Sequence, residues 1–271
     1  SLLAEAVHSV ADTSNQGLLL FGGSRARRKA TPEHPFGYGR ERYFWAFVVA
    51  LVLFSMGGLF AIYEGVEKLR HPHETESFGI AVAILLVAIV LETFSLTTAV
   101  REANHVRGDQ SWWSFIHRSK NPELPVVLLE DVGAEVGLFL ALGGVLLAHY
   151  TGEARWDAAG SLGIGILLVV IAILLATEMK SLLIGESAAP TDEQAIRGAV
   201  EGTPAVRRLI HMRTQHLGPD ELLVAAKLEF DANLSVAELA DAVNDTETRL
   251  RAAVPAARVI YLEPDLTRTT A

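Results

Sequence analysis

Residues 125–149 read PVVLLEDVGAEVGLFLALGGVLLAH, and this stretch decides the class of the fold. A helix needs about 20 predominantly apolar residues to cross a hydrocarbon layer of roughly 30 Å, and this run is long enough. The carboxylates of Glu130, Asp131 and Glu135 interrupt it. Ionisable groups at membrane depth are costly to bury, so the stretch predicts a membrane helix that also carries function.

The composition of the whole chain of 271 residues agrees with a membrane protein. Half of the residues are hydrophobic, and the mean hydropathy is +0.30, whereas soluble domains rarely have a positive average. A net charge of −9 argues against a nucleic-acid partner, because phosphate binding needs a basic surface. Cysteine is absent, so any metal must be held by His, Asp, Glu or Asn.

Long apolar runs are confined to the chain before about residue 186. Residues 44–63, 78–100 and 158–184 are also long enough to span a bilayer. Residues 1–23 have a helical pattern that Glu5, His8 and Asp12 interrupt, and no signal-peptide pattern is present. We interpret them as a fifth span entered part-way and expect a sixth span before it.

Basic residues in the short loops predict the orientation, because Lys and Arg gather on the cytoplasmic side. The second loop, residues 71–77, and the fourth, residues 151–157, contain few of them and should face outward. The C-terminal tail then lies in the cytoplasm. The first and third loops are predicted to be cytoplasmic because they contain Arg25, Arg27, Arg28, Lys29, Arg40 and Arg42, and Arg101, Arg107, Arg118 and Lys120.

The tail has a soluble composition and a mixed pattern of helices and strands. We expect helices at residues 193–202 and 236–253 and strands at 207–216, 222–230 and 258–262. Thr191 is the predicted N-cap of the first helix, and Ser235 with Glu238 forms a capping box for the second. The predicted fold is therefore a membrane α-helical bundle, with five spans present of six (residues 1–185), followed by a small α+β (αββαβ) cytoplasmic domain (residues 186–271).

Polar residues inside the first span form a candidate metal half-site. His8 and Asp12 lie four residues apart, and Asn15 follows three residues later, so the three share one helix face. One nitrogen and two oxygen ligands suit a borderline divalent cation such as Zn²⁺. The alternative is a hydrogen-bonded polar pair between helices, but intramembrane charge favours a functional role.

A second half-site must come from another span. Neighbouring residues of a helix project about 100° apart, so Glu130 and Asp131 cannot both face one ion, whereas Asp131 and Glu135 can. Both flanking carboxylates also have a structural interpretation. Glu130 would be a carboxylate at the membrane interface near the cytoplasmic side, and Glu135 would form a hydrogen bond between helices. Glu92, in residues 78–100, is a candidate ligand or proton-relay residue, or otherwise a buried hydrogen-bond donor. Gly133-x-x-x-Gly137 and Ser161-x-x-x-Gly165 indicate close helix packing, and the Gly57-Gly58 pair indicates either close packing or local flexibility.

Three motifs give the chain a family resemblance. AEAVHSVAD at residues 4–12, HPFGYGR at 34–40 and YEG at 63–65 resemble the cation diffusion facilitator family of divalent-metal transporters. The resemblance implies a six-span fold that begins one helix earlier, a homodimer and a metallochaperone-like cytoplasmic domain. It also implies export of Zn²⁺ or a related cation, with Mn²⁺, Fe²⁺ and Co²⁺ as alternatives, in exchange for protons.

The family's transport ligands map onto His8, Asp12 and Asp131, but the position of the remaining histidine is Val127. Glu130, Glu135, Asn15 or water would have to replace it. The Glu-Asp pair resembles the zinc transporter 9-like branch of the family. A site richer in oxygen favours harder cations such as Mn²⁺ or Fe²⁺ more than a site with two histidines does.

The resemblance also implies secondary metal positions outside the spans, and several of them have changed. His34 in the first loop and His211 in the tail match ligand positions, whereas Tyr38, Lys227 and Leu262 stand where histidines occur in relatives. We therefore expect the tail to support dimerisation more than metal sensing.

No enzyme motif competes with transport. A nucleophile elbow and a His-Glu-x-x-His run are both absent from the sequence, so we expect no catalytic residue, and we also expect no resident cofactor. The alternative function is a non-transporting membrane scaffold or partner-binding protein whose metal site has decayed, as Val127 suggests. We expect the chain to cross the membrane several times, in contact with membrane lipid, and to reside in a bacterial plasma membrane.

Overall fold

The computed structural model describes residues 2–71 and 78–265, and the side chains of the first helix from Ser14 onward. Most of the predicted second loop, residues 72–77, therefore lies outside the described residues. The chain divides into two compact units. The helical unit contains Ser1–Ser24 and Arg42–Lys180, and the cytoplasmic unit contains Arg25–Glu41 and Ser181–Ala271.

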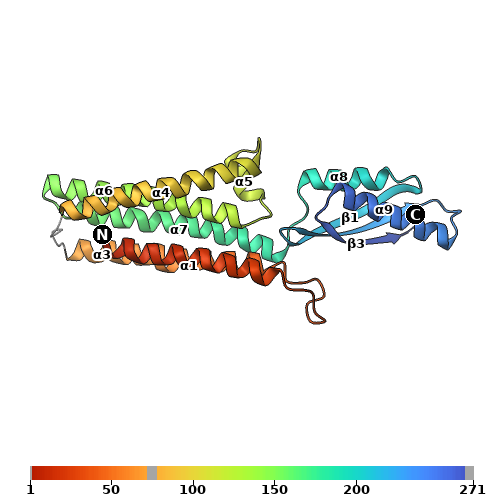
Figure 1. The fold of residues 1–271 in the computed structure, drawn as a ribbon, viewed down its shortest axis with the longest axis horizontal. Helices are drawn as coiled ribbons and strands as arrows, with labels where there is room; N and C mark the ends of the chain where they lie inside the picture. Colours follow the sequence, from red (N-terminus) through yellow and green to blue (C-terminus); the bar gives the residue numbers. More distant parts are fainter. Residues whose placement is uncertain (1, 72–77, 266–271) are drawn as a thin grey trace, which may run out of the picture. The chain divides into compact units, whose positions relative to one another are not determined.

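The helical unit is a bundle of long helices, drawn in Figure 1. In the described residues, four stretches are long and apolar enough to cross a membrane, namely Glu41–Arg70, Phe78–Arg107, Glu123–Thr151 and Arg155–Ile184. They contain the four apolar runs predicted from the sequence, and the helices continue past the runs at one or both ends. The elements are α1 (Leu2–Ala26), α2 (Glu41–Val52), η1 (Leu53–Leu59), α3 (Phe60–Arg70), α4 (Phe78–Arg107), the short α5 (Trp112–Arg118), α6 (Glu123–Thr151) and α7 (Arg155–Ile184).

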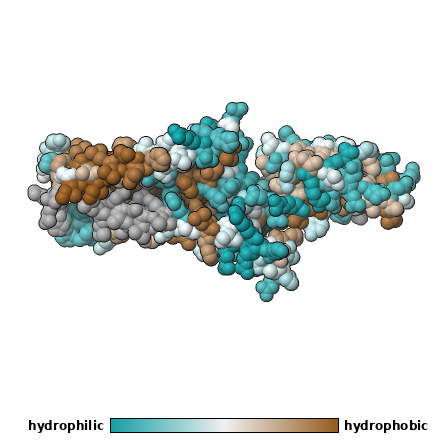
Figure 2. Space-filling model, in the orientation of Figure 1, coloured by the Kyte–Doolittle hydropathy of each residue, from teal (hydrophilic) through white to brown (hydrophobic). Residues whose placement is uncertain are grey.

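The outer surface of the bundle suits lipid. Figure 2 shows hydrophobic residues gathered over the helical unit on the face that it displays. Large apolar side chains that would be costly to leave in water are exposed along α4 in particular. They are Ile80, Ile84, Leu86, Val87, Val90, Leu91, Phe94 and Val106.

One span contains a π-helical segment that the sequence analysis did not predict. The element η1 joins α2 to α3 without a break, so Glu41–Arg70 forms a single span. Gly57 and Gly58 lie in this wide turn, and a side-chain carbon on Gly58 would meet Val169 of α7 at 2.6 Å. The glycine pair therefore serves close packing as predicted, within a local departure from α-helical geometry.

Glycines also set the approach of α7 to its other neighbours. A side-chain carbon on Gly165 would lie 2.8 Å from the backbone nitrogen of Ile62 and 2.9 Å from the carbonyl oxygen of Gly58. On α6, the same atom on Gly133 would meet Ile171 at 2.7 Å. The predicted packing roles of Gly133 and Gly165 are confirmed, because small residues let membrane helices approach closely.

The cytoplasmic unit contains a three-stranded sheet with two helices, in the predicted αββαβ order. Its elements are α8 (Pro190–Glu201), β1 (Val206–Gly218), β2 (Glu221–Phe230), α9 (Val236–Ala253) and β3 (Ala257–Pro264). The strands lie in the order β1-β2-β3, with β1 antiparallel and β3 parallel to the central β2. The parallel pair requires a crossover connection, which α9 provides.

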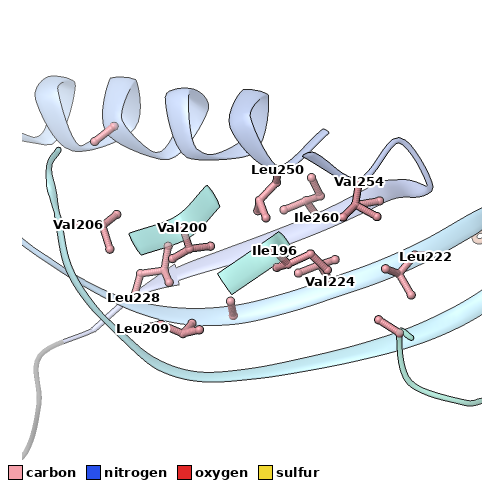
Figure 3. Close-up of a cluster of buried hydrophobic side chains, with 14 of the residues drawn as sticks. Ile196, Val200, Val206, Leu209, Leu222, Val224, Leu228, Leu250, Val254 and Ile260 are labelled. Carbon is pink, nitrogen blue, oxygen red and sulfur yellow. The ribbon is translucent and has the colours of Figure 1, made fainter. Parts of the chain in front are cut away.

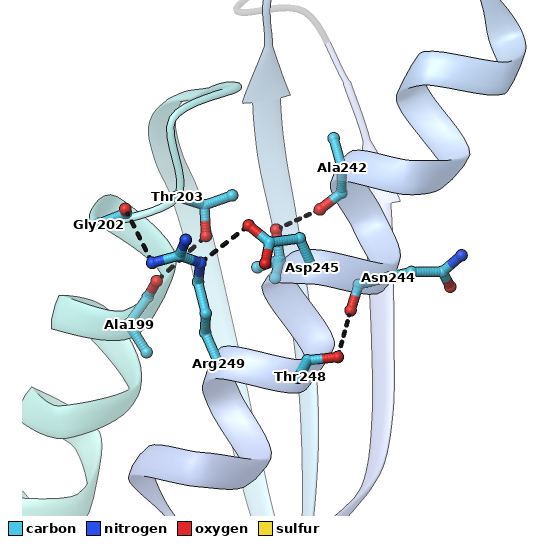
Figure 4. A network of polar contacts seen from close by, with 9 residues as sticks. Ala199, Gly202, Thr203, Ala242, Asn244, Asp245, Thr248 and Arg249 are labelled. Atoms are coloured by element: carbon cyan, nitrogen blue, oxygen red, sulfur yellow. Dashed lines mark hydrogen bonds and ion pairs between the residues drawn. The ribbon is translucent and has the colours of Figure 1, made fainter.

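The core of this unit lies between the sheet and its helices, as Figure 3 shows. Alternate residues of β2 are buried, so one face of the central strand points into the core. Ile196 and Val200 of α8 and Leu250 of α9 are fully buried against that face. The two helices are also joined by Arg249, whose guanidinium donates to Asp245 at 2.8 Å and to the carbonyl oxygen of Gly202 at 3.5 Å (Figure 4).

The helix caps of the cytoplasmic unit were predicted in part. The capping box of Ser235 and Glu238 is confirmed. The prediction that Thr191 caps α8 is wrong, because α8 begins at Pro190 and its N-cap is Ala189. Proline is well suited to the first helical position, since its missing N–H needs no partner there, and the sequence analysis overlooked this signal.

Candidate cation site

The polar groups of the spans meet between α1, α4 and α6. Asp131 of α6 is buried, and its Oδ2 accepts a hydrogen bond from Ser95 Oγ of α4 at 3.0 Å. One turn further along α6, Glu135 Oε1 accepts a hydrogen bond from Thr93 Oγ1 at 2.8 Å. The residue numbers fall on α4 as they rise on α6, so the two helices are antiparallel here, and the two contacts lie one after the other along the same helix pair. The sequence analysis identified both carboxylates and missed both hydroxyls.

A separate contact joins α1 to α6. Asn15 is fully buried, and its Nδ2 donates to Glu130 Oε1 at 2.6 Å. Glu130 therefore bonds a group of α1, whereas the neighbouring Asp131 bonds a group of α4. This agrees with the expectation that the two adjacent carboxylates cannot both face one ion, whereas the alternative of an interfacial Glu130 is wrong, because this side chain is buried against α1.

Two buried oxygen atoms in this region accept no hydrogen bond within the described part of the chain. They are Oδ1 of Asn15 and Oε2 of Glu135. A buried acceptor without a donor is costly unless another group satisfies it. A bound cation would do so, because amide and carboxylate oxygens are ordinary ligands for divalent metals.

His8 and Asp12 lie within α1, but their side chains are outside the described part of the structure. Glu92 lies on α4 and is half-buried. Val127 packs against an apolar cluster that contains Ala99, Phe115 and Leu128. Among the described side chains, no group of three His, Asp or Glu residues is placed to hold a metal ion.

The secondary metal positions have surroundings of their own. His34 is exposed, and its ring packs against Tyr38 with 4.7 Å between centroids. The hydroxyl of Tyr38 lies 3.2 Å from Thr31 Oγ1, and the guanidinium of Arg28 lies 4.8 Å from the centre of its ring. Tyr38 thus links three residues of the first loop to one another through polar and aromatic contacts.

In the cytoplasmic unit, His211 of β1 is exposed and stands opposite Lys227 of β2. The ammonium of Lys227 pairs with Glu263 at 2.9 Å and with Asp265 at 3.1 Å. The hydrogen bond to Glu263, followed by the one to Asp265, raises the pKa of Lys227 above its ordinary value. A fixed positive charge opposite His211 disfavours a metal cation there.

A further charged group that the sequence analysis missed joins the far ends of α3 and α7. Lys68 Nζ lies 3.2 Å from Glu64, 2.8 Å from Asp157 and 3.0 Å from the hydroxyl of Ser161. Glu64 belongs to the YEG motif, and the other partners come from α7. Together with Gly65, whose side-chain carbon would meet Leu162 at 2.7 Å, this contact ties the C-terminal end of α3 to the N-terminal end of α7.

Comparison with known proteins shows which family this chain belongs to. The family description "Cation efflux transmembrane domain" matches residues 1–184, and "Cation efflux protein, cytoplasmic domain" matches residues 188–265. This chain belongs to the cation efflux family. It is accordingly a multi-pass membrane protein with a cytoplasmic domain, as predicted.

Three relatives of this cation efflux protein illustrate its range. It is 33% identical over 236 residues to the human "Proton-coupled zinc antiporter SLC30A9, mitochondrial", and this match covers 86% of the chain and 42% of the relative. The chain thus spans about two fifths of that protein. It is 28% identical to "Metal tolerance protein C4" of Arabidopsis thaliana (87% of the chain, 52% of the relative) and 26% identical to "Cation-efflux pump FieF" of Klebsiella pneumoniae (96% and 81%).

Proposed function

We propose that this protein exports a divalent cation from the cytoplasm in exchange for protons, and that Zn²⁺ is its principal cargo. The observation that carries the proposal is the set of buried polar groups at membrane depth, with Asp131 at its centre. Relatives named as a zinc antiporter and a cation-efflux pump support this substrate class. Harder cations such as Mn²⁺, Fe²⁺ or Co²⁺ are alternatives, because the described candidate ligands are all oxygen atoms.

The proposed ligands come from α1 and α6. Asp131 supplies a carboxylate, and Asn15 supplies Oδ1, which accepts no hydrogen bond within the described part of the chain. His8 and Asp12 complete the site from α1, on the helix face predicted to include Asn15. Glu135 is a further candidate, while Glu130 serves to hold Asn15.

Proton exchange follows from the chemistry of these ligands. Imidazole and carboxylate groups must be deprotonated to bind a metal, so loading from the cytoplasm displaces protons. Rearrangement of the helices then exposes the site to the outer side, where protons compete for the same groups and the cation leaves. Histidine suits this exchange because it titrates near neutral pH.

We assign a separate role to each side of the predicted domain boundary at residues 185 and 186. We propose residues 1–185 as the transport domain and residues 186–271 as a domain that holds two copies of the chain together. Occupation of the position opposite His211 by Lys227 supports a structural role for this domain over metal sensing. The bacterial plasma membrane stays a prediction, since relatives include both a mitochondrial protein and a bacterial pump.

The test is cation uptake into proteoliposomes, with Zn²⁺, Mn²⁺, Fe²⁺ and Co²⁺ compared. We expect flux with at least one ion and its loss in the Asp12→Ala/Asp131→Ala variant. Asp241→Ala, which removes an exposed carboxylate of α9, is the matched control and should keep full activity. If the flux ignores an imposed pH gradient, proton coupling is wrong.

The alternative function is a membrane scaffold that keeps the fold without transport. Val127 favours it, because an apolar residue packed in an apolar cluster stands at the position where the family resemblance implies a metal-binding histidine. Absence of flux with all four ions, from protein that elutes as a folded species, would support this alternative.

A further inference from the structure

We infer that Ser95 is a positioning residue for the cation site, whose hydroxyl orients the Asp131 carboxylate toward the transported ion. The inference rests on the proposed function, in which Asp131 is a ligand. It is carried by the contact between Ser95 Oγ and Asp131 Oδ2 and by the way in which Ser95 differs from the other hydroxyl residues of α4.

A hydroxyl in a membrane helix normally donates to the carbonyl oxygen one turn earlier, because no water is available to it. Three hydroxyls of α4 follow this rule. Thr93 donates to the carbonyl of Ile89 at 2.7 Å, Thr97 to that of Thr93 at 2.6 Å, and Thr98 to that of Phe94 at 3.0 Å. In the described part of the chain, the hydroxyl of Ser95 instead bonds across the helix pair to Asp131.

Thr93 shows why this difference matters. Its hydroxyl lies within hydrogen-bonding distance of both the Ile89 carbonyl and Glu135 Oε1, and it has only one hydrogen to donate. The backbone therefore competes with Glu135 for that hydrogen. Among the described residues, Asp131 has no such competitor for Ser95, so this hydroxyl is a dedicated donor to one oxygen of one carboxylate.

A dedicated donor has a defined consequence for a metal ligand. With Oδ2 accepting from Ser95, rotation of the carboxylate about its terminal bond breaks a hydrogen bond to a charged acceptor. The side chain is thereby held in one orientation before the cation arrives. Hydrogen-bonding partners of ligating groups contribute in this manner at known metal sites, and their loss costs about 10- to 100-fold in metal affinity or activity.

The experiment measures Zn²⁺ uptake into proteoliposomes and Zn²⁺ binding to the detergent-purified full chain. For Ser95→Ala we expect KM and the dissociation constant to rise about tenfold, with Vmax within about twofold of the original. Ser95→Thr restores a hydroxyl and should return both constants to near the original values. Ser95→Cys, which has a weak donor, should give intermediate values.

Thr97→Val is the matched control, because it removes a hydroxyl of the same helix that, within the described residues, bonds only the backbone. Unchanged constants in Ser95→Ala, failure of Ser95→Thr to restore them, or an equal loss in Thr97→Val would each overturn the inference. If Ser95→Ala does not fold, the dissociation constants of the other two variants decide the question. The inference requires Ser95→Thr to bind Zn²⁺ more tightly than Ser95→Cys, and the reverse order or equal constants would overturn it. Absence of both flux and Zn²⁺ binding in the original protein would instead overturn the proposed function, and this inference with it.

Discussion

The two units of the chain bring their elements together in different ways. In the helical unit, helices approach each other closely at glycines, where a backbone meets a backbone, as at Gly58 and Gly165. In the cytoplasmic unit, the sheet and its helices are separated by large apolar side chains such as Leu228 and Leu250, both fully buried. The helical unit should therefore be sensitive to added atoms, and the cytoplasmic unit to removed ones.

The two units also use polar groups differently. In the spans, the polar contacts of the candidate site join separate helices, as in the buried contact of Asn15 with Glu130. In the cytoplasmic unit, ion pairs such as that of Arg207 with Asp231 lie at the exposed surface. Exposed pairs contribute little to stability, whereas a polar group in lipid needs a specific partner. A polar side chain is thus far more informative about function in the first unit than in the second.

Removal of atoms from the cytoplasmic core should give the largest effect on stability. Leu228→Ala leaves a cavity in the core beside the C-terminal part of β2, and we expect the unfolding free energy of this unit to fall by about 3 kcal/mol. Hydrogen exchange of the full-length protein, read by mass spectrometry on peptides from β1, β2 and β3, measures the change.

Val236→Ala is the matched control for that substitution. Val236 lies in the same unit at the start of α9, and its side chain is 85% exposed, so exchange in the strands should not change. Equal protection of the strands in Leu228→Ala and the original protein would show that the core does not unfold as one unit.

Addition of a single methyl group should have the next largest effect, now on the helical unit. In Gly165→Ala the new carbon would meet backbone atoms of Ile62 and Gly58, which cannot move aside without shifting a helix. We expect a loss of about 2 kcal/mol in stability. All four tryptophans, Trp45, Trp112, Trp113 and Trp156, lie in the helical unit, so thermal unfolding followed by their fluorescence reports on that unit.

Gly143→Ala provides the comparison for this glycine. Gly143 is also helical, but nothing lies within 4 Å of the position that its side-chain carbon would occupy. Its melting temperature should stay the same or rise slightly, because alanine favours the helix. Equal melting temperatures for the two variants would mean that the glycine contacts do not set the packing of α7.

Much of this fold could be predicted from the sequence, because its strongest signals are local. The spans follow from uninterrupted apolar length, and the order of elements in the cytoplasmic unit follows from alternation and from the capping box at Ser235. The π-helical turn of Leu53–Leu59 was not predicted, because its apolar residues and glycines read like the rest of the span, and its packing against α7 is not local in the sequence. The start of α8 was misplaced at Thr191 because a residue suited to capping outweighed the adjacent Pro190.

The candidate site could be predicted only in part. Carboxylates and amides inside apolar runs are conspicuous, and so Asp131, Glu135 and Asn15 were identified. Ser95 and Thr93 were missed, because hydroxyl residues are common in membrane helices and usually bond their own backbone. Only the pairing of α4 with α6 distinguishes a hydroxyl that reaches a carboxylate from one that does not.

The smallest expected effect concerns an exposed polar contact of the cytoplasmic unit, the capping box of α9. Ser235→Ala removes the hydroxyl that accepts from the Glu238 N–H, and should destabilise the start of α9 by about 1 kcal/mol.

The backbone N–H of Ser235, followed by its hydroxyl, lowers the pKa of Glu238 below its ordinary value. A lowered pKa means that this contact stabilises the folded state at neutral pH and is lost as the pH falls through the pKa of the folded protein. Hydrogen exchange in the first turn of α9, corrected for the intrinsic pH dependence of exchange, should therefore accelerate in acid, and Glu238→Gln should abolish that acceleration. If acid accelerates exchange equally in Glu238→Gln, titratable groups elsewhere in the cytoplasmic unit control the stability of α9. The exposed capping box would then contribute as little to stability as other exposed polar contacts do, in contrast to the buried contacts of the spans.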